Sequence, residues 1–148
     1  MLFQIENLHD IAERCRNGDP LDPEQAHWLG NCLYEFLSRG ADHLEEAFGL
    51  RAMRGGVPWR TEYAMRVRDS ALRALAQTLD QSCSLRARVL EIRRLTVSYA
   101  ASSWRWDQSN AEMPAHYAGT VKEHLWTAFQ SGAPMPIGER RLYQIVAD

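Results

Sequence analysis

Hydrophobic residues recur along most of the chain at intervals of three and four positions, which places their side chains on one face of an α-helix. The first such set is Leu8, Ile11, Ala12 and Cys15. No segment shows the strict alternation of hydrophobic and polar residues that is typical of a half-buried strand. The pattern predicts an all-α protein, a single-domain bundle of six or seven helices over residues 1–148.

Start and stop signals divide this pattern into helices. Asp22 is followed by Pro23 and Gln25, the arrangement of an N-cap, a first helical position and a capping box. Ser84 and Thr120 are further N-cap candidates. Glycines close several of the segments. The expected helices lie at about residues 8–15, 23–39, 42–49, 59–79, 85–106 and 121–131, with a last short helix after Gly138.

Two tryptophans lie near the end of the fifth expected helix, in the stretch SSWRWDQSN. Trp106 continues the apolar stripe of Leu85 and Tyr99, and Trp104 joins a second stripe with Leu90 and Val97. At about 100° per residue the two rings point roughly 200° apart, so they cannot together stack nucleic-acid bases on one surface. We therefore predict a buried central helix with Trp106 in the core.

Composition and cysteine usage narrow the class of protein. A chain of 148 residues can bury a sizeable core, and none of its apolar runs approaches the roughly 20 residues that span a bilayer. The stretch MLFQIENLHD lacks the basic start and long apolar run of a signal peptide. Three cysteines without CxxC spacing are typical of free thiols. We expect a cytoplasmic protein that does not bind membranes.

The net charge of −2 conceals two segments of opposite sign. Residues 1–50 carry ten acids against three arginines, a balance of −7. Residues 51–105 carry eleven arginines against four acids, a balance of +7. Two interpretations stay open: the segments attract one another within one fold, or the basic segment binds an acidic partner.

The stretch RAMRGGVPWR, residues 51–60, is the segment most typical of a binding loop. Its candidate partner-binding residues are Arg51, Arg54, Trp59 and Arg60. Two glycines and a proline predict an exposed loop, and loops carry binding residues disproportionately. The alternative is that Trp59 anchors the loop to the core and the arginines are merely solvated.

The fourth expected helix carries charged residues whose expected roles differ. Glu62, Arg66, Asp69 and Arg73 are spaced as an alternating ladder on one solvated face. Arg68 instead projects on the apolar side. For Arg68 we favour a partly buried ion pair with an acid from the N-terminal half, and the alternative is a ligand contact.

Motifs for metal binding and catalysis are weak or missing in the sequence. Glu24-x-x-His27 has the spacing of a di-iron ligand pair, but the chain has no second copy of that motif. Cys83 has no histidine nearby in sequence, and Cys32 resembles a small core hydrophobe. No GxGxxG, P-loop, GxSxG or HExxH is present. We expect no metal, no cofactor and no enzymatic activity.

Residues 45–76 and the later stretch YAASSWRWD carry a weak resemblance. Ala47-Phe48-Gly49-Leu50, the Gly55-Gly56 turn, Arg68-Asp69 and Leu72-Arg73 resemble small helical proteins encoded in prophage and plasmid regions of proteobacteria. The resemblance implies a mobile-element origin. It implies no activity and no site residues.

These observations favour a non-enzymatic protein-binding module, a bacterial regulator or inhibitor encoded by a mobile element. The first alternative is a nucleic-acid-binding regulator that uses the arginine-rich residues 51–105. Residues 37–50 can be aligned with a helix-turn-helix, but the second helix would place Asp42, Glu45 and Glu46 against phosphates. The second alternative is an enzyme of unrecognised type. The identity of the partner and the oligomeric state stay open.

Overall fold

The computed structural model describes residues 2–52 and 54–147, and these residues form helices and no strands. The six helices of nine residues or more are α1 (Leu2–Asn17), α2 (Pro23–Leu37), α4 (Trp59–Thr78), α5 (Leu85–Ala101), α7 (Val121–Gln130) and α8 (Glu139–Ala147). The shorter elements are α3 (Leu44–Ala47), α6 (Trp104–Asp107) and the 3-10 helix η1 (Ala115–Tyr117). The all-α fold class is confirmed.

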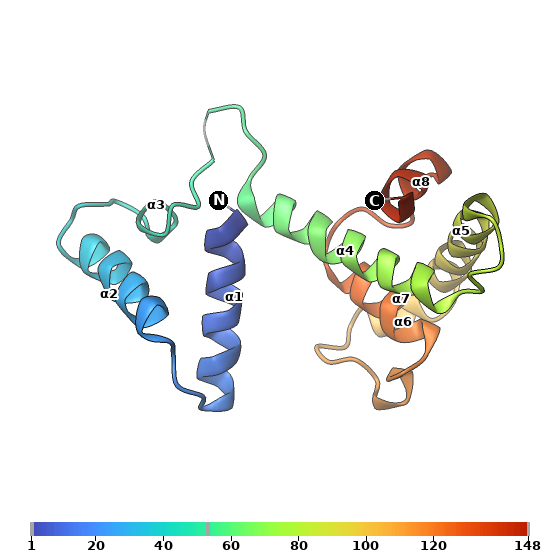
Figure 1. Cartoon of the computed structure of the whole chain (residues 1–148), viewed down its shortest axis with the longest axis horizontal. Helices are drawn as coiled ribbons and strands as arrows, with labels where there is room; N and C mark the ends of the chain where they lie inside the picture. The colour runs from blue at the N-terminus through green and yellow to red at the C-terminus, as the bar shows by residue number, and fades with distance from the viewer. Residues whose placement is uncertain (1, 53, 148) are drawn as a thin grey trace. The chain divides into compact units, whose positions relative to one another are not determined.

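The chain divides into two compact units, Met1–Arg60 and Thr61–Asp148, and α4 begins in the first and continues in the second. Figure 1 shows the course of the chain through both. That residues 1–148 form a single domain stays a prediction.

The helix boundaries of the N-terminal unit follow from local signals. α1 ends before Gly18, which has a φ of +77° that L-residues with a side chain rarely adopt. At the start of α2, the Asp22 amide donates a hydrogen bond to the Gln25 side chain at 3.3 Å. The end of α2 differs from the expected glycine stop, because Arg39 is the residue with a positive φ of 61°. A Cβ on Gly40 would lie 3.0 Å from Cγ of Glu35, so a side chain at this position would require Glu35 to shift.

The core of the N-terminal unit is small. α2 packs against α3, and the ring centroids of Trp28 and Phe48 lie 5.6 Å apart. The buried hydrophobic residues described in this unit are Ile5, Ile11, Cys32, Ala41, Ala47 and Leu50. Much of the apolar surface of α2 therefore lies outside the core.

The C-terminal unit has the larger core. Leu72 and Leu75 of α4 are fully buried, together with Ile92 of α5 and Leu142 of α8. α5 and α8 lie side by side (Figure 1). At one end of this core the ring of Phe129 packs against other aromatic rings, with centroid distances of 5.2 Å to Tyr99 and 5.3 Å to Trp104.

The predicted continuous helix to Trp106 is wrong. Ser102 has φ −119° and ψ −99°, which ends α5, and α6 then starts at Trp104. The break changes the rotation of the chain, so Trp104 packs against the core and Trp106 is 79% exposed. α5 itself has one buried face and is not buried all round, since Leu90 and Val97 are 44% and 49% exposed.

Candidate protein-binding surfaces

The arginine loop, residues 51–60, lies in the N-terminal unit next to the acidic helix α3. Met53 falls outside the described residues. Arg51 forms an exposed ion pair with Glu46 at 3.3 Å. The indole Nε1–H of Trp59 donates a hydrogen bond to Oε1 of Glu45 at 3.0 Å. Two neighbouring carboxylates of α3 thus hold two of the four predicted binding residues.

The remaining two predicted residues present positive charge to solvent. The guanidinium carbon of Arg60 lies 5.4 Å from the centroid of the Trp59 ring, in cation–π contact. Arg54 is exposed and precedes Gly55, whose φ is +83°. The structure therefore places Trp59 and Arg60 together as one aromatic–cationic pair, with Arg54 on a separate turn.

A second exposed surface lies on α2. Leu33, Tyr34 and Leu37 are 41%, 74% and 77% exposed, and we call them the α2 apolar face. Leu33 and Leu37 share helical spacing with Leu29 and Phe36, which are partly buried. The apolar arc of α2 is therefore wider than the part that packs.

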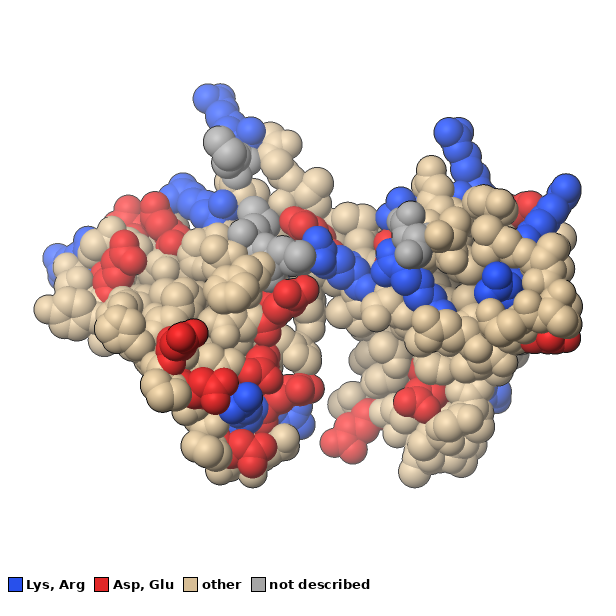
Figure 2. All heavy atoms as spheres, viewed as in Figure 1, with Lys and Arg blue, Asp and Glu red and all other residues tan. Residues whose placement is uncertain are grey.

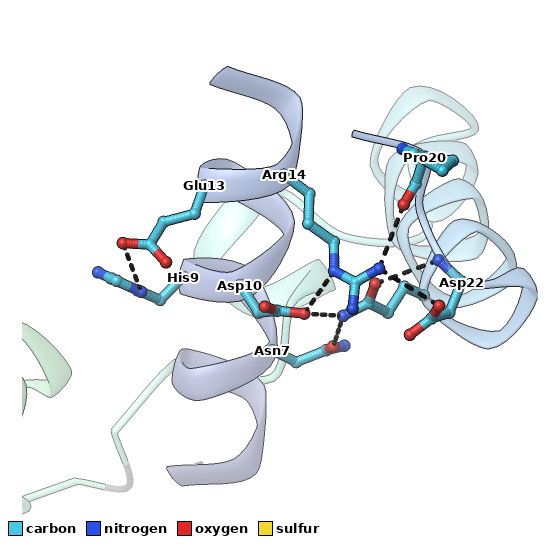
Figure 3. A network of polar contacts seen from close by, with 8 residues as sticks. Asn7, His9, Asp10, Glu13, Arg14, Pro20 and Asp22 are labelled. Atoms are coloured by element: carbon cyan, nitrogen blue, oxygen red, sulfur yellow. Dashed lines mark hydrogen bonds and ion pairs between the residues drawn. The ribbon is translucent and has the colours of Figure 1, made fainter. Parts of the chain in front are cut away.

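Acidic side chains gather in several patches on the face of the N-terminal unit that Figure 2 shows. A polar network within this unit joins α1 to the start of α2 (Figure 3). Arg14 pairs with Asp10 at 3.0 Å and Asp22 at 3.3 Å, and it donates a hydrogen bond to the Pro20 carbonyl oxygen at 3.2 Å. The hydrogen bond from Gln25 keeps the pKa of Asp10 below its ordinary value. One arginine therefore neutralises acids at the connection between the two helices.

Arg68 lies in a buried ionic cluster of the C-terminal unit. It is 4% exposed and pairs with Asp69 at 2.7 Å, and it donates a second hydrogen bond to the Pro134 carbonyl oxygen at 3.3 Å. Asp69 also pairs with Arg141 of α8 at 3.0 Å. The predicted ion pair is present, but its acid is the adjacent residue and does not come from the N-terminal half.

Of the charge ladder predicted on α4, the first ion pair alone is present as expected. Glu62 and Arg66 lie 3.8 Å apart on the surface. Asp69 is 8% exposed and turns inward to Arg68 and Arg141, whereas Arg73 donates a hydrogen bond to the Ile145 carbonyl oxygen at 3.0 Å. The contact between α4 and α8 thus uses charged residues that periodicity assigned to solvent.

A buried carboxylate that the sequence analysis missed lies at the end of α6. Asp107 is 6% exposed, and its Oδ2 accepts hydrogen bonds from the hydroxyls of Tyr99 at 2.6 Å and Tyr117 at 2.8 Å. Burial, followed by these bonds to the carboxylate, raises the pKa of both tyrosines. These hydrogen bonds hold α6 and η1 against α5, and we assign the cluster a structural role.

The metal candidates Glu24 and His27 and the thiol of Cys32 lie on α2, and Cys83 lies in the C-terminal unit. Glu24 and His27 are exposed, and the His27 ring is 3.0 Å from the side-chain nitrogen of Asn31. Across residues 2–52 and 54–147 no group of three or more potential ligand side chains could hold a metal ion. Cys32 is buried, and this burial raises the pKa of its thiol, whereas Cys83 is exposed.

Comparisons with protein families, curated proteins and solved structures found no match to this chain. No described helix combines the length and the apolar character needed to cross a membrane.

Proposed function

We propose that this chain is a non-enzymatic protein-binding module that recognises an acidic protein through the arginine loop. The observation that carries the proposal is the Trp59–Arg60 pair. Tryptophan and arginine are the residues most enriched in the energetic centres of protein interfaces. The Glu45 hydrogen bond holds the Trp59 ring before any partner arrives, which lowers the ordering cost of binding. The weak resemblance to mobile-element proteins favours a regulator or inhibitor.

The charge around the loop supports a protein partner over nucleic acid. Glu45 lies against Trp59 and Glu46 against Arg51, so a phosphate backbone approaching this surface would meet two carboxylates. α3 was the candidate recognition helix, and its four residues make just over one turn. Recognition helices read base edges along a groove, for which so short a helix offers too few side chains.

The proposal is tested by comparing two charge-matched variants of the full chain. Arg54→Ala/Arg60→Ala removes the two loop arginines other than Arg51, which pairs with Glu46. Arg16→Ala/Arg105→Ala removes two exposed arginines elsewhere. Each protein is immobilised and used to capture proteins from nuclease-treated lysate of the source cell, followed by mass spectrometry. We expect one protein to be recovered by the parent chain and by the second variant, and to be lost with the first.

The association rate of the recovered protein is then measured at several salt concentrations. Unpaired surface charges act mainly by electrostatic steering, so the loop variant should lower the association rate more than it raises the dissociation rate. Recovery that needs intact nucleic acid would favour the nucleic-acid alternative. Equal recovery by both variants would remove the loop from the proposal.

A further inference from the structure

A cavity of about 250 Å³ lies in the C-terminal unit, between the end of α4 and the first turns of α5. Three residues with small or apolar side chains and three charged residues line it: Leu79, Cys83, Ala87, Asp80, Arg88 and Glu91. Small-molecule sites commonly combine apolar walls with a few placed polar groups. The volume lies below the ~300–1,000 Å³ of sites for drug-sized molecules, so this cavity fits a smaller ligand.

Two of the three charged side chains in the lining have no ion-pair partner. Glu91 is neutralised by Arg94, whose guanidinium nitrogens lie 2.6 and 2.9 Å from its carboxylate oxygens. Within residues 2–52 and 54–147, no carboxylate pairs with Arg88 and no cation pairs with Asp80. Arg88 and Asp80 form no ion pair with each other either, although both line the cavity. The cavity therefore presents one positive and one negative charge that the fold does not neutralise.

Neutral neighbours hold both of these charged side chains in place. Nη1 of Arg88 donates a hydrogen bond to Oε1 of Gln81 at 2.8 Å. The Ser82 amide donates one to Oδ1 of Asp80 at 2.9 Å, and hydrogen bonds from Ser82 keep the pKa of Asp80 below its ordinary value. An arginine side chain stays protonated in proteins. Both groups are therefore charged at neutral pH and are positioned without being paired.

We propose that this cavity binds a free α-amino acid with an aliphatic side chain. Such a molecule carries a carboxylate and an ammonium group on the same carbon atom. The carboxylate pairs with Arg88, whose planar guanidinium suits it, and the ammonium group pairs with Asp80. The aliphatic side chain lies against Leu79 and Ala87 and gains from leaving water. A ligand with one charge would leave Arg88 or Asp80 without its partner.

The test titrates the full chain with L-leucine and with two analogues, using isothermal titration calorimetry. 4-Methylpentanoic acid lacks the ammonium group of leucine, and 3-methylbutylamine lacks its carboxylate, whereas both keep the aliphatic chain. We expect saturable binding of leucine and at least about tenfold weaker binding of each analogue. Leucine binding that does not saturate would overturn the proposal. So would an analogue that binds as tightly as leucine, because one of the two ion pairs would then be missing.

Variants assign each charge of leucine to its partner. Asp80→Asn keeps an acceptor for the Ser82 amide and removes the charge, so it should weaken leucine about tenfold and leave 4-methylpentanoic acid no weaker than before. Arg88→Gln should weaken leucine by a similar factor and spare 3-methylbutylamine. Glu112→Gln, at an exposed position outside the cavity, should bind leucine like the parent. Leucine affinities that are equal in all three variants would overturn the proposal.

The thiol of Cys83 locates bound leucine without any change to the charged residues. Cys15 and Cys83 are exposed and Cys32 is buried, so Cys15→Ser leaves Cys83 as the accessible thiol of the described residues. Leucine at ten times its dissociation constant should slow the reaction of Cys83 with Ellman's reagent roughly tenfold, since Cys83 lines the cavity. An unchanged rate at that concentration would place leucine elsewhere on the chain and would overturn the site.

Discussion

The hydroxyl of Tyr99 lies 2.6 Å from Oδ2 of Asp107, although the two residues belong to different helices and are eight positions apart. The carboxylate is buried, and it accepts a second phenolic hydrogen bond from Tyr117. These bonds hold α6 and η1 against the end of α5. The packing of the C-terminal unit therefore depends on Asp107.

Asp107→Ala should destabilise the C-terminal unit strongly. The substitution leaves two buried hydroxyls without their acceptor, at a cost of about 1–3 kcal/mol each. Glu112→Gln, at an exposed position a few residues further on, should change stability by less than about 0.5 kcal/mol. Urea unfolding followed by tryptophan fluorescence measures both, and similar midpoints for the two variants would contradict the assigned role of Asp107.

Alkaline pH should weaken the C-terminal unit through its buried tyrosines. Their pKa values are raised in the folded chain, so above pH ~10 the unfolded tyrosines lose protons that the folded ones keep. The stabilisation is fully present below that pH, and it is lost as pH rises toward the folded pKa, at about 1.4 kcal/mol per pH unit for each tyrosine.

Tyr99→Phe checks this dependence. The variant should be less stable at pH 7 by about 1–2 kcal/mol, because it loses a hydrogen bond to a carboxylate. Its decline between pH 10 and 11 should be shallower than that of the parent by about 1 kcal/mol. Parallel pH profiles in urea unfolding would show that Tyr99 titrates normally in the folded chain.

The buried ionic cluster should respond unequally to the loss of two neighbouring arginines. Arg68→Met leaves Asp69 with one partner, Arg141, and should cost toward the lower end of ~3–5 kcal/mol. Arg66→Ala breaks an exposed pair and should cost about 0.3–0.5 kcal/mol. Thermal unfolding of the two variants gives the comparison. If both costs are small, the Arg68–Asp69 pair does not stabilise the fold.

The two tryptophans of the WRW stretch should also differ. Trp104→Ala removes a ring that packs against Phe129 and should cost about 2 kcal/mol or more. Trp106→Ala removes a largely exposed ring and should cost less than about 0.5 kcal/mol. In variants that keep either Trp104 or Trp106 as their one tryptophan, acrylamide should quench the fluorescence of Trp106 more efficiently than that of Trp104. Efficient quenching of Trp104 and protection of Trp106 would restore the continuous-helix prediction.

Features that depend on a few neighbouring residues could be predicted from the sequence. The expected N-caps of α5 and α7 are confirmed, since Ser84 accepts a hydrogen bond from the Ala87 amide and Thr120 accepts one from the Lys122 amide. Their partners lie within three residues, so local sequence contains the whole motif. The extent of α4 was predicted to within one residue for the same reason.

Features that depend on contacts between residues far apart in the sequence could not be predicted from it. Asp69 has the spacing of a solvated ladder residue, and its burial depends on Arg141, 72 positions away. The break at Ser102 has no glycine or proline to signal it, and the contacts that hold it come from Tyr99 and Tyr117. Periodicity identified the apolar positions of α2, but it cannot tell whether another element covers Leu37. Of the candidate binding residues, sequence reasoning found the arginine loop and missed the α2 apolar face.

The break at Ser102 has a consequence for the chain lengths that this fold can tolerate. In a continuous helix residues 99 and 107 would lie about 12 Å apart along the axis, too far for a hydrogen bond. A residue inserted between Ser102 and Trp104 would rotate and shift Asp107 away from Tyr99, so an insertion here should be poorly tolerated. Residues 108–114 connect Asp107 to η1 without regular helix, and an added residue there raises the closure entropy only slightly. The connections on the two sides of α6 should therefore respond oppositely to the same insertion.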